Sequence, residues 1–182
     1  PFEVPQRAQA VRQIVAGLER LHRHMHWLGV AAHEAGFDTL FMYSWRDREV
    51  VMKLLETMTG NRVNYSINVL GGVKNDITPE IAAELRKGMD YLEERIRYYL
   101  DVVTTDTMFL NRTRNIGTIT RDEAEFFGLL GPTARASGLA RDVRLEAPYA
   151  SYARFPISLI TDERGDLEAR FVVRMKELLV TC

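Results

Sequence analysis

The first 35 residues restrict the folds that this chain can adopt. Apolar side chains recur from Val11 to Ala32 at steps of three and four residues, which is the period of an amphipathic α-helix. Pro5 suits the first turn of such a helix, and Gly36 suits its C-terminal stop. A helix of about 30 residues is roughly 45 Å long, which is more than an ordinary small domain needs. The sequence therefore predicts an elongated bundle of long helices.

Three further segments have helical periodicity. One runs from Asp38 to a stop at Gly60, one opens at Thr78-Pro79, and one covers residues 166–182. Between residues 62 and 70 the period changes to strict alternation, which is typical of a half-buried strand that Gly71-Gly72 would turn into a hairpin.

The remaining segments are shorter. Thr120 and Glu123 have the spacing of a capping box, which predicts a short helix ending near Gly128. We expect residues 128–152 to be rich in loops and residues 154–160 to form a short strand. The predicted fold class is mainly α, an elongated bundle of long helices with a small β-hairpin, and residues 1–182 are expected to form a single domain.

Composition excludes several classes of protein. The 24 basic residues nearly cancel the 25 acidic ones, so no overall field draws the chain to nucleic acid or to an acidic membrane surface. The single cysteine, Cys182, excludes a disulfide within the chain and indicates a reducing compartment. No apolar run is long enough to span a membrane. Because the chain begins without Met and its predicted last helix reaches the final residue, we expect a central fragment of a larger subunit.

The histidines are the most visible metal candidates. His22 and His26 share one helix face, but His33 lies about 10 Å further along the axis at 1.5 Å per residue. Zinc usually needs three or four ligands close together. We therefore expect packed or hydrogen-bonded histidines and no metal site, with a two-histidine site completed by another chain as the alternative.

Two other positions are candidates for chemistry. Glu34 lies beside His33 at the end of the first helix, where the helix dipole disfavours a carboxylate, and a carboxyl next to an imidazole can relay protons. Arg135 lies in a segment of small residues, 131–138, whose backbone can approach another group closely. A solvated glutamate and a structural turn are the alternatives.

The charged run Arg46-Asp47-Arg48-Glu49 lies between Trp45 and the apolar pair Val50-Val51. A solvated face is the usual interpretation of such a run. Its apolar neighbours favour ion pairs that support the fold, because buried arginine pairs are more often scaffolding than catalysts.

Several stretches in order resemble one known family. They are Gly-Phe-Asp-Thr-Leu-Phe-Met-Tyr-Ser-Trp-Arg-Asp-Arg-Glu at 36–49, Thr-Gly-Asn-Arg-Val-Asn-Tyr at 59–65, Gly-Gly-Val at 71–73 and Gly-Pro-Thr-Ala-Arg-Ala-Ser-Gly at 131–138. The chain is similar to the large subunit of energy-converting [NiFe] hydrogenases such as formate hydrogenlyase. It also resembles the quinone-site 49 kDa subunit of respiratory NADH dehydrogenase.

The resemblance implies roles for single residues. Glu34 matches an acidic position that partners the quinone-site histidine, and His33 beside it is taken with it as a catalytic candidate. Arg135 is expected to face the active cavity, which makes it a cofactor-binding candidate. Asn64, a second such candidate, stands where the NADH dehydrogenase branch commonly has a histidine near the terminal iron–sulfur cluster of a neighbouring subunit. Because asparagine cannot titrate, that redox-linked protonation is expected to be missing here.

The resemblance also implies cofactors and partners for the parent enzyme. It would use a Ni-Fe centre or a quinone, with iron–sulfur clusters in partner subunits, and quinone binding and NAD binding are both typical of such complexes. A Ni-Fe centre takes two Cys-x-x-Cys pairs, so this chain, with one cysteine, is expected to hold no cofactor itself.

We therefore expect a fragment of an oxidoreductase subunit that is inactive alone. Its parent would contact an iron–sulfur small subunit and membrane subunits, and no nucleic acid. It would pass electrons to protons or quinone on the cytoplasmic, inner face of the cell membrane. The alternative is a helical scaffold that only binds partners.

Overall fold

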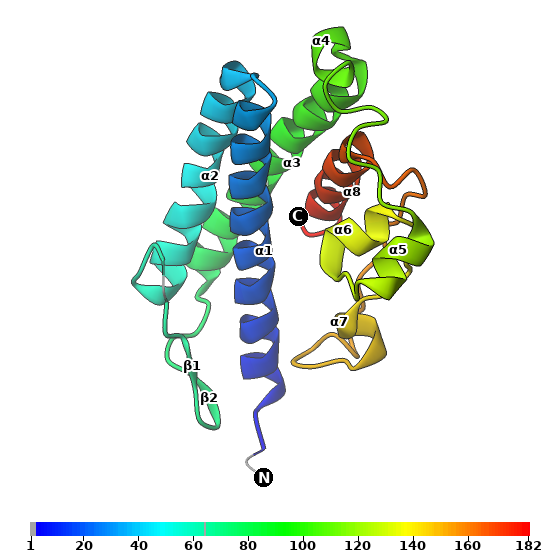
Figure 1. The fold of residues 1–182 in the computed structure, drawn as a ribbon. Helices are drawn as coiled ribbons and strands as arrows, with labels where there is room; N and C mark the ends of the chain where they lie inside the picture. The colour runs from blue at the N-terminus through cyan, green and yellow to red at the C-terminus, as the bar shows by residue number, and fades with distance from the viewer. Residues whose placement is uncertain (1–2, 64) are drawn as a thin grey trace.

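Four helices build the body of the molecule in the computed structural model, which describes residues 3–63 and 65–182 (Figure 1). They are α1 (Gln6–Glu34), α2 (Asp38–Thr59), α3 (Pro79–Thr105) and α8 (Leu167–Leu179). Helix α1 packs along α2, α2 packs on α3, α3 packs on α8, and α8 also contacts α1. The prediction of a mainly helical, elongated bundle is confirmed.

The ends of the long helices follow from local chemistry. Pro5 precedes α1, and Gly36, with φ of +74°, takes the left-handed conformation in the turn to α2. Nη1 of Arg112 donates to the carbonyl oxygens of Ala35 (2.6 Å) and Gly36 (3.3 Å) and so satisfies acceptors beyond the last turn of α1. At the start of α3, the Thr78 side chain accepts from the backbone N–H of Ile81, and proline occupies the first turn.

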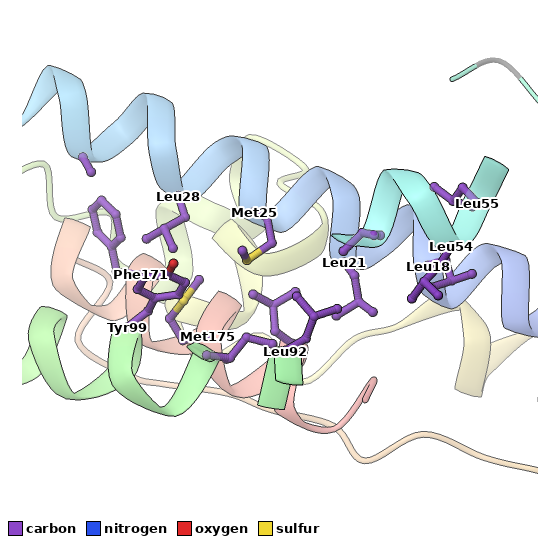
Figure 2. Close-up of a cluster of buried hydrophobic side chains, with 14 of the residues drawn as sticks. Leu18, Leu21, Met25, Leu28, Leu54, Leu55, Leu92, Tyr99, Phe171 and Met175 are labelled. Carbon is purple, nitrogen blue, oxygen red and sulfur yellow. The ribbon is translucent and has the colours of Figure 1, made fainter. Parts of the chain in front are cut away.

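One apolar cluster lies between the long helices (Figure 2). Its largest fully buried side chains come from α1, α2, α3, α4 and α8. They include Leu21, Met25, Leu28, Leu55, Leu92, Tyr99, Phe109, Phe171 and Met175. Because the stripe at helical spacing on α1 is the one that is buried, the periodicity of the sequence decides which face of the rod meets the core.

Helices α1 and α2 approach each other closely at Gly29. A Cβ atom at this position would lie 2.5 Å from Cδ1 of Trp45 and 2.6 Å from the hydroxyl oxygen of Ser44. Real Cβ atoms do not come that close to other heavy atoms, so any larger residue here would require the side chains of Ser44 and Trp45 to move.

The β-hairpin is shorter than the alternating pattern predicts. Strand β1 (Asn68–Val69) pairs antiparallel with β2 (Gly72–Val73), and Gly71 takes a φ of +78° in the turn between them. The strand predicted over residues 62–70 is therefore wrong outside residues 68–69, as far as the described residues go. The alternation fails because the paired segment is only two residues long, and of the alternating apolar residues only Ile67 is fully buried.

Short helices fill the region between α3 and α8. They are α4 (Thr107–Leu110), α5 (Arg121–Phe126), α6 (Gly131–Ala136) and α7 (Val143–Glu146). Helix α5 is the one that the capping box predicts, and both bonds of that box are formed. Residues 131–136 form a helix instead of the expected loop, because Pro132 suits a first turn and Ala134 and Ala136 are small enough to be buried.

Two further expectations are corrected. Residues 154–160 form no strand, because no neighbouring strand pairs with them in the described part of the chain; Gln13 instead donates to the Phe155 carbonyl and ties this segment to α1. The last helix ends at Leu179 rather than running to the final residue. Among the described residues, none of the helices is long and apolar enough to cross a membrane.

Candidate functional site

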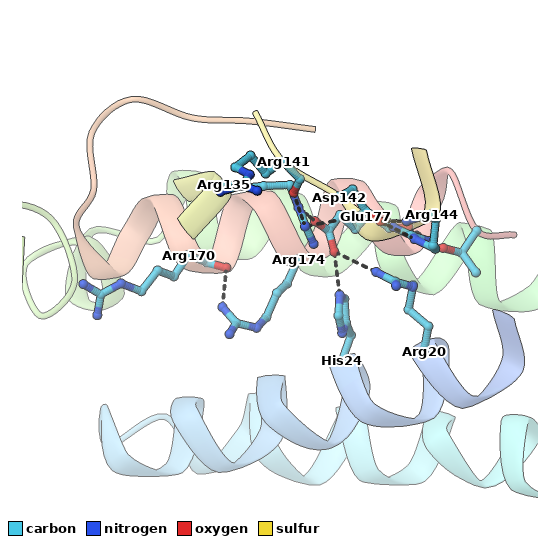
Figure 3. Close-up of polar contacts among 10 residues, drawn as sticks. Arg20, His24, Arg135, Arg141, Asp142, Arg144, Arg170, Arg174 and Glu177 are labelled. Carbon is cyan, nitrogen blue, oxygen red and sulfur yellow. Dashed lines mark hydrogen bonds and ion pairs between the residues drawn. The ribbon is translucent and has the colours of Figure 1, made fainter. Parts of the chain in front are cut away.

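Glu177 on α8 is the centre of a buried polar network (Figure 3). Its Oε2 accepts from Nε2 of His24 at 2.8 Å, and its Oε1 accepts from Nε of Arg135 at 2.6 Å. Nη1 of Arg20 lies 3.4 Å from the same carboxylate. Helices α1, α6 and α8 each contribute to the site, so it depends on residues 153 positions apart in sequence.

A second carboxylate extends the network toward α7. Nη1 of Arg135 lies 3.2 Å from Asp142 and also donates to the Arg141 carbonyl. Arg144 holds Asp142 with two bonds, from Nε at 2.9 Å and from Nη2 at 2.7 Å. Bidentate pairs of this kind fix both partners in one orientation. The side chain of Arg135 therefore bridges two buried carboxylates.

The charges in this network do not balance. Arg20, Arg135 and Arg144 face only Glu177 and Asp142 among the described residues. A further guanidinium, that of Arg174, lies 3.7 Å from the centre of the Trp27 ring, where the aromatic face stabilises a cation. Burial lowers the pKa of Arg174 to about 10. The site therefore carries more positive than negative charge.

Burial and hydrogen bonding set the protonation of the titratable groups. The pKa of His24 is lowered, mainly by burial, although Glu177 opposes the shift. Burial alone would raise the pKa of Glu177, but the hydrogen bonds from His24 and Arg135 outweigh it and the pKa is lowered. Asp142 behaves in the same way, since burial opposes the shift but the bonds from Arg144 bring its pKa to about 2. Near neutral pH the arrangement holds a neutral imidazole that donates to an ionised carboxylate.

Among the described residues of this network, His24 is the side chain whose ordinary pKa lies closest to physiological pH. Its Nε2 proton is held by Glu177, which leaves Nδ1 as the position for a second proton. The arginines stay charged throughout. A proton gained by His24 would reside on Nδ1, opposite the nitrogen that binds Glu177.

The residues of the charged run 46–49 bind different partners, and Asp47 has the most. Asp47 is fully buried and accepts from Nε of Arg46 and Nε of Arg95, both at 2.8 Å, and from the hydroxyls of Tyr91 at 2.9 Å and Tyr99. Although burial opposes it, this set of donors lowers the pKa of Asp47. The interpretation of the run as ion pairs that support the fold agrees with these contacts.

The other two residues of the run bond elsewhere. Nη2 of Arg48 lies 2.6 Å from Nε2 of His22, and Glu49 pairs with Arg62. Because a guanidinium only donates, Nε2 of His22 must accept, and its proton must lie on Nδ1. Burial and the neighbouring Arg48 lower the pKa of His22 accordingly. Among the described residues, no group of three or more His, Cys, Asp or Glu is arranged to hold a metal ion.

The corner between α1 and α2 holds the predicted catalytic pair. Nδ1 of His33 lies 2.7 Å from Oδ1 of Asp38, and its ring lies 5.4 Å from that of Phe41. Glu34 is exposed at the last position of α1. The next residues, 35–37, line a cavity of about 280 Å³ together with Asp106, Met108, Phe109 and Arg112. Glu34 therefore borders this cavity without lining it.

The structure does not gather the predicted site residues into one place. His24 and Glu34 are ten residues apart on α1, which is about 15 Å along the axis, so the corner and the Glu177 network are separate. Arg135 is buried among contacts within the chain, and its role facing an active cavity stays a prediction. Asn64 lies outside the described residues.

Glu177 is the functional candidate that sequence reasoning misses. A glutamate in an amphipathic helix gives no signal of its own. One usable clue is its position, because Glu177 follows the buried Val173 by four residues and so shares a face of α8 with it.

A Ni-Fe centre does not fit the residues of this chain. Soft thiolate ligands suit such a centre, and it would take two Cys-x-x-Cys pairs, whereas the sequence has Cys182 alone.

Comparisons with known proteins identify the family. The family described as "Respiratory-chain NADH dehydrogenase, 49 Kd subunit" matches residues 34–181. The D 2 subunit of the NADH-quinone oxidoreductase of Rhizobium etli is 38% identical over 97% of this chain and 44% of its own length. Formate hydrogenlyase subunit 5 of Escherichia coli is 35% identical over 97% of this chain and 31% of its own length.

A solved structure shows the same fold. A chain in the structure of the membrane-bound sulfane sulfur reductase, an archaeal respiratory membrane complex, superimposes with a TM-score of 0.91 at 30% identity. The match covers 99% of this chain and 48% of that chain. This chain thus spans less than half of the length of these three relatives. It belongs to the family of the 49 kDa subunit of respiratory-chain NADH dehydrogenase.

Proposed function

We propose that the chain is the central part of an oxidoreductase subunit that works beside an iron–sulfur partner and passes electrons to protons or to quinone. The observation that carries the proposal is the match of 97% of the chain to a formate hydrogenlyase subunit and to subunits of NADH-quinone oxidoreductases. The parent would lie at the inner face of the cell membrane and would be held there by membrane subunits.

The relatives differ in the reactions that their names describe. Quinone reduction, formate hydrogenlyase activity and sulfane sulfur reduction occur in complexes that contain versions of this bundle. The shared helical bundle therefore supports a role that is common to all three complexes. In our proposal the bundle positions the redox groups of the complex and supplies protons, while the acceptor itself carries the redox step.

Two groups on α1 serve that role. Glu34 is exposed at the α1–α2 corner, beside a cavity and next to His33, so it can collect a proton from water and pass it on. His24 lies deeper in the bundle on Glu177 and is the titratable group of the buried network. The quinone or Ni-Fe centre of the parent would supply the electron chemistry.

The test is Glu34→Gln in the intact enzyme. This substitution keeps the size and the hydrogen bonding of the side chain but removes its proton, so we expect turnover to fall by about 10²–10⁴-fold with normal subunit assembly. The measurement is electron transfer from the iron–sulfur partner to the terminal acceptor across pH, in membranes with confirmed subunit content.

Two controls accompany this experiment. Glu34→Asp retains a titratable group and is expected to restore much of the rate. Glu94→Gln removes a carboxylate from α3, away from the corner, and is expected to leave the rate unchanged. If Glu34→Gln has the wild-type rate at every pH, Glu34 is a solvated residue at a helix end.

A further inference from the structure

Tyrosines and arginines gather on the surface where α2 packs on α3. Tyr43 of α2 and Tyr91 and Tyr98 of α3 are each between 37% and 42% exposed. The guanidinium of Arg95 contacts two of these rings, at 6.0 Å from the centre of Tyr43 and 4.8 Å from that of Tyr98. The guanidinium of Arg46 lies 5.0 Å from the centre of the Tyr43 ring. These five side chains, Tyr43, Arg46, Tyr91, Arg95 and Tyr98, form a tyrosine–arginine patch.

A buried carboxylate holds the two arginines of the patch in place. Nε of Arg46 donates to Oδ1 of Asp47, and Nε of Arg95 donates to Oδ2, both at 2.8 Å. The hydroxyl of Tyr91 donates to Oδ1 of the same carboxylate at 2.9 Å. Because Asp47 is fully buried, these bonds fix the patch from beneath. Side chains that are already held in one conformation lose little entropy when a partner binds.

The patch retains donor groups for another molecule. Among the described residues, Arg46 donates only to Asp47 and only from Nε, which leaves both of its Nη groups to donate elsewhere. Its side chain is 55% exposed. The two guanidiniums of the patch pair with the one carboxylate of Asp47 in the described part of the chain, so one positive charge is in excess. The paired N–H groups of a guanidinium match the two oxygens of a carboxylate.

The composition of the patch is typical of protein–protein interfaces. Tyrosine and arginine are enriched in such interfaces and are frequent among the residues that contribute most to binding. A two-fold contact between copies would place patch against patch, and like charges would then oppose each other. Nucleic acids and anionic membranes are bound by several cations, whereas the patch offers one excess positive charge. A single carboxylate on a different polypeptide therefore fits the patch best.

We infer that the tyrosine–arginine patch is the docking surface for another subunit, which presents an aspartate or glutamate side chain to Arg46 and apolar groups to the rings of Tyr43 and Tyr98. The inference rests on the proposed role of the chain as part of a multi-subunit enzyme. It adds the place where one partner binds and the chemistry that this partner presents.

The first measurement uses the intact wild-type complex. Hydroxyl-radical footprinting read by mass spectrometry reports how far water reaches each tyrosine. Tyr99 is the internal reference, because its ring lies 5.6 Å from that of Tyr98 and is fully buried within the bundle. We expect Tyr43 and Tyr98 to be oxidised as slowly as Tyr99 in the complex, and all three to react alike after unfolding. Faster oxidation of Tyr43 and Tyr98 than of Tyr99 in the complex would show an open patch and overturn the inference.

The second measurement identifies the partner group. Arg46→Lys puts an amine in place of the guanidinium, and a water-soluble carbodiimide joins an amine to a carboxylate in direct contact with it. We expect an amide between residue 46 and an acidic side chain of another subunit. Arg97→Lys on α3 is the matched control, because the Arg97 side chain is 65% exposed and pairs with Glu93 of the same chain. This variant is expected to give only the product with Glu93.

A product that joins residue 46 to a second copy would contradict the inference, and so would the absence of a product with another subunit. If the Arg46→Lys variant does not assemble, the footprint of the wild-type complex decides. Failure of the proposed function is distinguishable, because a purified enzyme without other subunits would contradict that proposal. An open patch in a complex that contains its other subunits would contradict this inference alone.

Discussion

Asp47 and Glu177 are both buried in this bundle, and they are held by different kinds of partner. Asp47 on α2 accepts from two arginines and two tyrosines. Glu177 on α8 accepts from two arginines and from His24. None of the partners of Asp47 titrates near neutral pH, whereas an imidazole does. Asp47 is therefore a fixed anchor between helices, and Glu177 is an anchor whose charge environment can change.

The exposure of the partner arginines separates the two sites further. The side chain of Arg135 is only 4% exposed, whereas that of Arg46 is 55% exposed. A guanidinium in contact with water can be solvated again if its carboxylate is lost. A guanidinium buried inside the bundle cannot be solvated in this way.

The largest predicted effect follows from this difference. Glu177→Gln leaves Arg135 with Asp142 as its one charged partner among the described residues, so we expect a loss of about 3–5 kcal/mol in the free energy of unfolding. Urea unfolding followed by circular dichroism measures it. Glu146→Gln is the matched control, because Glu146 pairs with Arg141 at the surface and such pairs contribute about 0–1 kcal/mol. Equal losses in the two variants would contradict the buried role of Glu177.

A smaller effect is expected at the other anchor. Asp47→Asn retains one acceptor for the buried hydroxyl of Tyr99 and leaves Arg46 partly in water, so we expect a loss of about 1–3 kcal/mol in the free energy of unfolding. Tyr99→Phe, which removes one of the donors, is a suitable companion variant. The comparison between the two carboxylates fails if Asp47→Asn is as destabilising as Glu177→Gln under the same conditions.

The third prediction concerns pH. The pKa of His24 is lowered in the folded state from an ordinary value of 6.5, so the unfolded chain binds a proton before the folded chain does. The contribution of this group to stability should therefore be complete above about pH 6.5 and decrease as the pH falls below that value, by at most about 1.4 kcal/mol per pH unit.

The variant that tests it is His24→Gln, which keeps a donor for Glu177 but cannot titrate. Unfolding curves at a series of pH values between about 7 and about 5 should show a flatter dependence for this variant than for the wild type. His33→Gln, at an exposed position, serves as the control. Identical slopes for wild type and His24→Gln would remove His24 as the titrating group of the Glu177 network.

The long helices can be predicted from sequence, and the network cannot. The stripe from Val11 to Ala32 and the capping box at Thr120 both depend on residues within a few positions of each other, and both are found as expected. His24 and Glu177 are 153 positions apart. Nothing in either helix says which residue will face the other, because a polar residue on an apolar face has the same local pattern whatever its partner.

Two segments depart from their sequence patterns for related reasons. The alternation of residues 62–70 is a valid strand pattern, but a strand also needs a long partner, and here the pairing extends over two residues. The small residues around Arg135 suggest a loop that approaches a ligand. They instead form α6 and let it pack on α8, which brings Arg135 into the interior beside Glu177.

The tight contact at Gly29 gives the first two helices a mechanical property. The side chains of Trp45 and Ser44 fill the space where a side chain at residue 29 would be, so they lie directly against the backbone of α1 and oppose sliding of α1 along α2. We expect the two helices to move together as a rigid pair with a length of roughly 40 Å. If the pair pivots as a rigid body about the contact at Gly29, a displacement of the corner near Glu34 would move the hairpin end in the opposite direction. Spin labels at the two ends of the pair would report opposite displacements if the two helices move as a rigid body. They would report uncorrelated displacements if α1 bends.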